Sequence, residues 1–188
     1  MRLLIVGSNQ SWAIERIYLK YLKELNPDTF LFPAQNLLHE YLSSSILNRI
    51  FFRIGLSGIY NRINKKLIEY AEEIKPEIIW VFKGMEVLPS TLKLFKSKGI
   101  KLVNYNPDHP FIISGRGSWN KNVFNSVGMY DLHLCYSKLL MKKISEEYKI
   151  RTEILPFGFE LDEHIYDKVK NINEINKVCF IGNPDKIR

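Results

Sequence analysis

Cysteine is scarce in this chain, and its two cysteines are not arranged to hold a metal. Cys135 and Cys179 each lie inside an apolar run, and neither belongs to a Cys-x-x-Cys pair. A zinc site is therefore not expected, and no other spacing of metal-ligating residues suggests a metal. We expect buried, reduced thiols, which are typical of a cytoplasmic protein.

Long apolar runs are also missing. The first run, residues 3–6, is closed by Gly7 and is too short for a signal peptide. No run in the sequence is long enough to cross a membrane. The sequence therefore predicts no membrane-spanning segment.

Several motifs that define large enzyme classes are absent. The turn after the first apolar run, residues 7–12, has one glycine and not the G-x-G-x-x-G pattern, which argues against NAD or FAD. No G-x-S-x-G elbow is present, which argues against a serine hydrolase of that type. A nucleic-acid partner is not expected, because no helix-turn-helix or RNP-like pattern accompanies the basic charge.

The 188 residues do have the composition of a folded domain. They are 46% hydrophobic and 25% charged, which is enough apolar material for one domain with a sizeable core. The formal net charge is +7. Such a surface favours anionic partners, with a solvated basic surface as the alternative.

Apolar runs alternate with amphipathic segments along most of the chain. Strands are predicted at residues 3–7, 29–33, 78–82, 101–105, 130–136 and 152–156, with helices between them. This alternation predicts an α/β, Rossmann-like, three-layer domain with a mainly parallel sheet.

The last part of the chain predicts a domain boundary. We expect one domain over residues 1–161, a polar linker over 162–176 and, over 177–188, the opening strand and helix cap of a second domain. The chain is then the first part of a longer protein. In the alternative, the strand at Lys177 joins the existing sheet.

Polar residues gather just past the predicted strand at 101–105. Pro107 and Pro110 stiffen the backbone there, and Asn106, Asp108 and His109 follow the strand. Ligands bind at the carboxyl ends of strands in open α/β sheets, so we interpret this stretch as the polar centre of a binding cleft. Asp108 and His109 are the candidate general bases. The alternative is a proline-rich surface turn.

Two other strand ends supply further candidates. Lys83, Gly84 and Glu86 follow the strand at 78–82, and Ser8 and Asn9 follow the first strand. Each set is placed to contact a polar ligand or, alternatively, forms an ordinary strand end. His133 alternates along a predicted strand and is interpreted as a structural histidine.

Residues 49–66 combine basic and apolar side chains. The preferred interpretation is that the stripe Ile46, Leu47, Ile50, Phe51 and Ile54 belongs to the core and that the neighbouring basic residues form its solvated side. The alternative is a basic amphipathic face that contacts a membrane surface.

Five motifs in order resemble the N-terminal half of CgeB-like, family-1-type glycosyltransferases of the GT-B class. They are residues 78–84, 102–111, 130–137, 155–159 and 180–183. The resemblance covers about residues 75–188 with recognisable motifs whose specificity lies in their order, whereas residues 1–74 match only in layout.

The resemblance implies two Rossmann-like domains that face each other across a cleft. The first holds the acceptor, which is a glycan, a lipid-linked molecule or a protein, and the second holds the nucleotide-sugar donor. The family often has an acidic pair where this chain has Asp108-His109, so Asp108 matches and His109 departs. Gly182 matches the glycine that faces the donor phosphates, with Asn183 beside it.

No metal or other cofactor is implied, because helix dipoles and basic side chains offset the diphosphate charge. The expected reaction is sugar transfer to an acceptor hydroxyl in bacterial surface-glycan synthesis or protein glycosylation, in the cytoplasm or at the inner membrane face. These 188 residues alone are expected to be inactive. The alternative function is a non-catalytic α/β module that binds a phosphorylated or glycan ligand.

Overall fold

Six strands form one all-parallel sheet in a computed structural model that describes residues 1–111 and 120–158. Their order across the sheet is β2-β1-β3-β4-β5-β6. The strands are β1 (Leu3–Val6), β2 (Thr29–Phe32), β3 (Ile78–Phe82), β4 (Lys101–Tyr105), β5 (Leu132–Cys135) and β6 (Arg151–Ile154). The predicted α/β class is confirmed, and each of the six strands predicted between residues 3 and 156 coincides with an observed one to within two residues at either end.

Helices connect the strands, as a parallel sheet requires. They are α1 (Ile14–Leu25), α2 (Ala34–Ser44), α3 (Ile46–Arg53), α4 (Ile59–Ile74), α5 (Pro89–Ser97), α6 (Lys121–Ser126) and α7 (Lys138–Tyr148), with a 3₁₀ turn at Val127–Met129. Pro89 opens α5, and Gly99, at φ +78°, follows its end.

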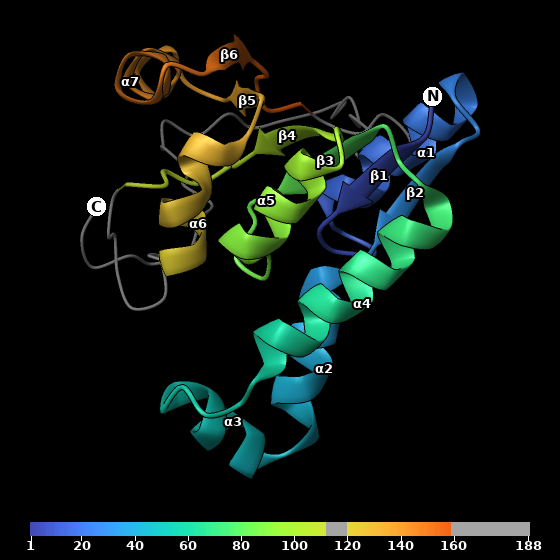
Figure 1. The fold of residues 1–188 in the computed structure, drawn as a ribbon, viewed down its shortest axis with the longest axis vertical. Coiled ribbons are helices and arrows are strands. Elements are labelled where there is room, and N and C mark those ends of the chain that lie inside the picture. Colours follow the sequence, from blue (N-terminus) through green and yellow to red (C-terminus); the bar gives the residue numbers. More distant parts are fainter. Residues whose placement is uncertain (112–119, 159–188) are drawn as a thin grey trace, which may run out of the picture.

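The helices cover two faces of the sheet (Figure 1). On one face, α1 packs through Tyr18 against Trp80 and Phe82. On the other face, α4 and α5 contribute Leu67 and Leu92 to the largest apolar cluster. The result is the three-layer, Rossmann-like arrangement that the sequence predicts.

The preferred interpretation of α3 as part of the core is wrong. No residue of α3 is buried, and the five side chains of the predicted stripe are between 43% and 68% exposed. The reason is positional, because α3 lies at the far end of α2 and α4, away from the sheet (Figure 1). Periodicity identifies the stripe but not what covers it.

Two structural predictions for the fifth strand are confirmed. His133 is buried, and its Nε2 lies 2.8 Å from the Val127 carbonyl oxygen. Burial lowers the pKa of His133 to about 4, although the contact with that carbonyl opposes the shift. Cys135 is a free, buried thiol.

Other predictions fall outside the described residues. These are the linker at 162–176, the domain opening at 177–188, and Cys179, Gly182 and Asn183. Over the described part of the chain, no helix is both long enough and apolar enough to span a membrane.

Candidate functional site

The loops after β1 and β3 diverge at the carboxyl edge of the sheet. The two strands are neighbours, but β1 leads to α1 on one face and β3 leads to α5 on the other. Such a switch point opens a crevice between adjacent loops, where doubly wound proteins bind ligands. Ser8 and Glu86, both predicted site residues, lie in these two loops.

A buried carboxylate supports the β1 loop. Glu15, in the first turn of α1, accepts a hydrogen bond through Oε1 from the Ser8 N–H, at 3.0 Å. Gly7 makes room for it, since a Cβ on residue 7 would lie 2.5 Å from Glu15 Oε1. Burial raises the pKa of Glu15, while its own backbone N–H, the Ser8 N–H and the charge of Lys83 oppose the shift.

The β3 loop turns through a left-handed corner. Lys83 has φ +59° and Gly84 has φ +92°, and the Lys83 N–H donates to the Tyr105 carbonyl. A non-glycine residue in this region is strained, and such strain often occurs at ligand sites. The corner directs the Lys83 ammonium toward Asp108, where Nζ and Oδ2 are 2.6 Å apart.

Glu86 is a buried carboxylate at the same edge, with only 4% of its surface exposed. Burial raises its pKa to about 7. Its own backbone N–H and Lys83 act against this rise, and the charge of Glu15 adds to it. A carboxyl group with a pKa near neutrality is suited to proton transfer.

Asn64 of α4 fixes the position of the Glu86 loop. Its amide nitrogen donates to the Glu86 carbonyl at 2.8 Å, and its amide oxygen accepts from the Leu88 N–H at 2.9 Å. Asn64 is itself buried. It is therefore a positioning residue, which holds the backbone on both sides of Val87.

The β4 loop is organised by its own side chains. Asn106 is buried, and its Oδ1 accepts from the Asp108 N–H at 3.0 Å. His109 Nδ1 accepts from the Phe111 N–H at 3.2 Å, which in the neutral ring leaves the proton on Nε2. Burial and then the nearby charge of Lys143 lower the pKa of His109, although a hydrogen bond with the backbone of His109 itself opposes them.

A cavity of about 460 Å³ opens beside the switch point. It joins the β1 loop and Glu86 to the start of α2. Its lining residues are Ser8, Gln10, Trp12, Gln35, Asn36, Leu38, His39, Leu42 and Glu86. Asn9 stands at its border, where its N–H donates to Asn36 Oδ1 at 2.7 Å.

The structure therefore brings the predicted site residues together in two groups. Ser8 and Glu86 line the cavity, whereas Lys83 and Asp108 form an ion pair in the neighbouring loops. Asp108 and His109 do not line it. Gln35 and Asn36, which sequence reasoning missed, follow β2 as the other candidates follow their strands.

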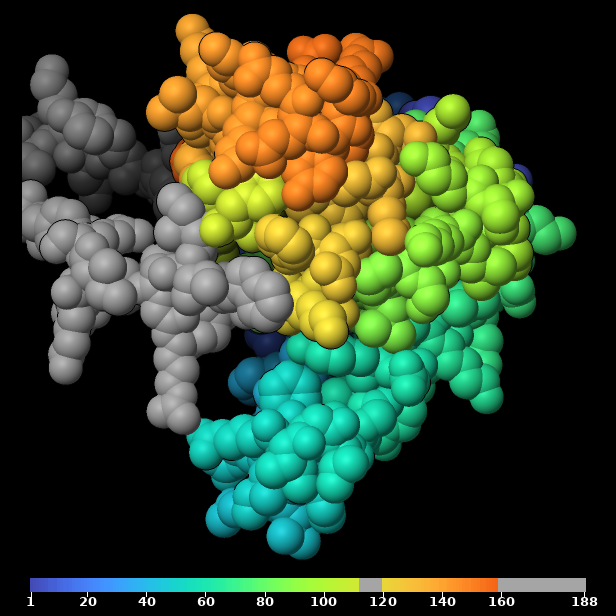
Figure 2. All heavy atoms as spheres, turned by 60° about the vertical axis from the view of Figure 1, so that its left-hand side comes forward, coloured from blue at the N-terminus to red at the C-terminus, as the bar shows by residue number. Residues whose placement is uncertain are grey.

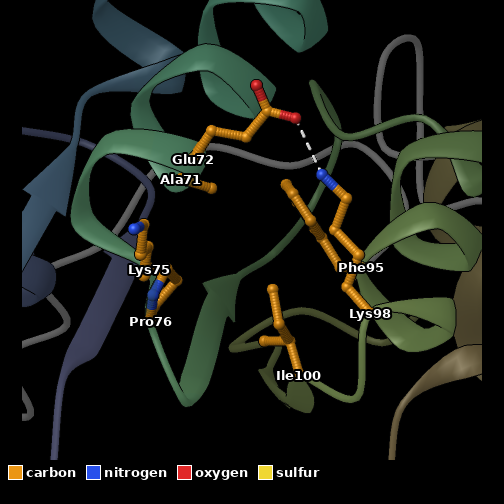
Figure 3. A pocket seen from close by; sticks show the side chains of 7 residues that line it. All are labelled: Ala71, Glu72, Lys75, Pro76, Phe95, Lys98 and Ile100. Atoms are coloured by element: carbon orange, nitrogen blue, oxygen red, sulfur yellow. Dashed lines mark hydrogen bonds and ion pairs between the residues drawn. The ribbon is translucent and has the colours of Figure 1, made fainter.

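A second cavity, of about 320 Å³, lies at the opposite edge of the sheet. Figure 3 shows Phe95 and Ile100 facing Ala71, with the ion pair between Glu72 and Lys98 at one side. The charged side chains that line it are exposed, and none of its lining residues follows the carboxyl end of a strand. It therefore lacks a buried carboxyl group such as Glu86, which lines the switch-point cavity.

Residues 1–111 and 120–158 contain no group of three or more His, Cys, Asp or Glu side chains placed to hold a metal. The switch point carries ionisable side chains of both signs, Glu86 and Lys83. Their chemistry suits a polar molecule with hydroxyl groups, since carboxylates accept and ammonium groups donate hydrogen bonds.

Comparison with known proteins identifies the fold. No protein-family model and no curated protein matches the sequence. A solved structure that is similar is a putative UDP-N-acetylglucosamine 2-epimerase from Listeria monocytogenes, with a TM-score of 0.53 and 14% sequence identity. The match covers 78% of this chain and 41% of that one, so the chain spans less than half of its neighbour's length.

The chain is therefore a Rossmann-like domain of the GT-B type. At this identity the likeness shows the fold and not the reaction. The CgeB-like family stays a hypothesis that rests on the sequence motifs.

Proposed function

We propose that this chain is the acceptor-binding half of a GT-B-type glycosyltransferase related to the CgeB-like family. The observation that carries the proposal is the placement of Glu86, a buried carboxyl group with a pKa near 7 in the wall of the switch-point cavity. The reaction is transfer of a sugar from a nucleotide sugar to an acceptor hydroxyl, in bacterial surface-glycan synthesis or protein glycosylation. We place the protein in the cytoplasm.

In the proposed mechanism, the acceptor hydroxyl enters the cavity and lies against a general base. The base removes the hydroxyl proton as the oxygen attacks the anomeric carbon, and the bond from that carbon to the phosphate oxygen breaks. The nucleoside diphosphate leaves with the electron pair. The protonated base then returns its proton to solvent.

Glu86 now joins Asp108 and His109 as a candidate base. It is favoured because it lines the cavity, whereas Asp108 pairs with Lys83 and the His109 ring already accepts a hydrogen bond at Nδ1. In this proposal the acceptor is bound or its loops are supported by five further residues, Ser8, Asn9, Lys83, Gly84 and Asn106. The donor side, with Gly182 and Asn183, belongs to a second domain that opens at residues 177–188.

A second candidate function is epimerisation of a nucleotide sugar. The fold neighbour, which is described as a putative UDP-N-acetylglucosamine 2-epimerase, favours it. An epimerase returns the sugar at inverted configuration and needs no acceptor. The same buried carboxyl group would then exchange a proton with the sugar carbon.

Product analysis separates the two candidates. The full-length gene product is incubated with a panel of nucleotide sugars, with and without a glycan acceptor mixture from bacterial envelopes, and the products are identified by mass spectrometry and NMR. A transferase adds the mass of the donor sugar to an acceptor and releases nucleoside diphosphate. A changed sugar configuration without acceptor would replace the transferase assignment by the epimerase one.

A thermal-shift titration tests the division into two halves. Nucleotide sugars should raise the melting temperature of the full-length protein and leave that of residues 1–188 unchanged, because ligands stabilise only a form that has their site. A strong shift of residues 1–188 would show that this domain has a complete nucleotide site. The proposed division would then be wrong.

A further inference from the structure

The α3 tip, residues 46–56, exposes an apolar stripe that a folded domain would normally bury. Its exposed apolar residues are Ile46, Leu47, Ile50, Phe51, Ile54 and Leu56. A contiguous exposed apolar surface of this kind marks an interaction site.

The stripe is exposed although the helix itself is well anchored. Phe52 packs edge-on against Tyr60 of α4, with ring centres 5.7 Å apart. Asn48 donates to the Tyr41 carbonyl at 3.0 Å, and Ser45 caps the helix by accepting from the Leu47 N–H. These contacts use the side of α3 that faces α2 and α4, and so they leave the apolar stripe facing outward.

The charge around the stripe has one sign. Residues 41–68 contain no Asp or Glu. They contain five basic residues, Arg49, Arg53, Arg62, Lys65 and Lys66. Arg49 and Arg53 flank the stripe, are exposed, and form no ion pair with any carboxylate of the described residues.

The tip lies beyond the carboxyl edge of the sheet. Asn64 of α4 contacts the loop after β3, so the part of α4 before Asn64 and all of α3 extend past that edge. Figure 1 shows α3 at the end of the α2–α4 pair, and Figure 2 shows the same region as a lobe that projects from the body. A flat surface can therefore reach the tip without meeting the sheet.

We propose that the α3 tip docks on the surface of a bilayer that contains anionic phospholipid. The apolar stripe enters the boundary between headgroups and acyl chains, while Arg49 and Arg53 contact the phosphates. The positive charge favours an anionic bilayer over a second copy of the chain as the partner of the stripe, since two such tips would bring like charges together. This inference rests on α3 and is independent of the proposed reaction.

Vesicle flotation tests the proposal directly. Residues 1–188 should float with vesicles of mixed phosphatidylglycerol and phosphatidylcholine and should stay in solution with phosphatidylcholine alone. Ile50→Ser/Phe51→Ser should weaken the partition about tenfold or more, through lost apolar burial. Arg49→Ala/Arg53→Ala should weaken it about 30-fold, from about fivefold for each basic residue.

A matched control comes from α7. Lys138→Ala/Leu139→Ser also removes an exposed cation and an exposed apolar side chain, and it should leave the partition unchanged. For the depth of insertion, Phe51→Trp should show blue-shifted emission on anionic vesicles, whereas Leu139→Trp should not. Circular dichroism of each variant checks that it remains folded.

Three outcomes would overturn the proposal. The first is equal binding to neutral and anionic vesicles, and the second is equal loss in the α3 variants and the α7 control. The third is a dimer in lipid-free solution that Ile50→Ser/Phe51→Ser converts to monomer, because a second copy would then cover the stripe.

Discussion

Glu15 and Glu86 are buried at the carboxyl edge of the sheet, whereas the apolar side chains of the α3 tip are exposed at the end of the molecule. Both regions reverse the usual distribution of polar and apolar groups. Burying a carboxyl group costs stability, whereas an exposed apolar side chain only lacks the stability that burial would give it. The α4 helix, adjacent to both, buries its apolar face in the ordinary way. The contrast separates the residues of α4, which stabilise the fold, from the buried carboxyl groups and the exposed α3 stripe, whose placement we attribute to binding a ligand or a surface.

The largest effect should come from comparing α4 with α3. Leu67 is fully buried, so Leu67→Ala should lower the free energy of unfolding by about 2–5 kcal/mol. Ile50→Ala on the exposed stripe should change it by less than about 0.5 kcal/mol. Urea denaturation measures both, and an equal loss for the two variants would mean that α3 is part of the core.

The next effect is the pH dependence that Glu86 imposes. Its pKa in the folded state, about 7, lies above its ordinary value of 4.5, so the fold favours the protonated form. The associated stability is fully present below pH 4.5 and is lost as the pH rises through about 7. It amounts to about 3 kcal/mol.

The variant Glu86→Gln isolates the pH-dependent stability that Glu86 contributes. Unfolding free energies of the wild type and the variant are measured at pH 5 and pH 8, so that all other titrating groups cancel in the difference. The wild type should lose about 2–3 kcal/mol more than the variant between the two pH values, since a small part of the term is already lost at pH 5. Parallel pH profiles would show that Glu86 is not buried in the folded protein.

A smaller effect is expected at Gly7. Gly7→Ala places a Cβ against the Glu15 carboxylate and should destabilise the domain by about 1–3 kcal/mol. In a double-mutant cycle, the same change should cost less in a Glu15→Ala background, because the clash is gone. If the losses of stability in the two single variants simply add in the double variant, the strain of Gly7→Ala does not come from contact with Glu15.

The smallest effect should follow Lys83→Met. Its ion pair with Asp108 is partly exposed, so at pH 5 the loss should be under about 1 kcal/mol. The charge of Lys83 lowers the pKa of Glu86, so the variant should move the pH-dependent loss of stability to higher pH. A shift to lower pH would contradict the arrangement of charges at the switch point.

The sequence predicts the fold well because most of the strands are short apolar runs closed by turn residues. It also predicts part of the candidate site, since the rule that ligands lie past strand ends selects Ser8 and Glu86, which line the cavity. The same rule, applied after β2, would have found Gln35 and Asn36. The rule does not show that α1 turns Glu15 toward the β1 loop, where its carboxylate is buried.

The burial of Glu86 also depends on a distant residue. Asn64 reaches its loop from a helix 22 positions earlier in the chain, and no local pattern shows that contact. The prediction that the α3 stripe belongs to the core was wrong for a related reason. A helical period gives the direction of an apolar face, but only the tertiary arrangement decides whether another element covers it.

The most direct test of the proposed site is turnover of the full-length enzyme with Glu86→Gln. Glutamine keeps the shape of the side chain but cannot accept the acceptor proton, so kcat should fall about 100-fold or more with little change in KM. The exposed Glu146→Gln on α7 is the matched control and should retain wild-type turnover. Loss in Glu86→Gln alone would support the buried carboxyl group as the base, whereas wild-type turnover in that variant would contradict it.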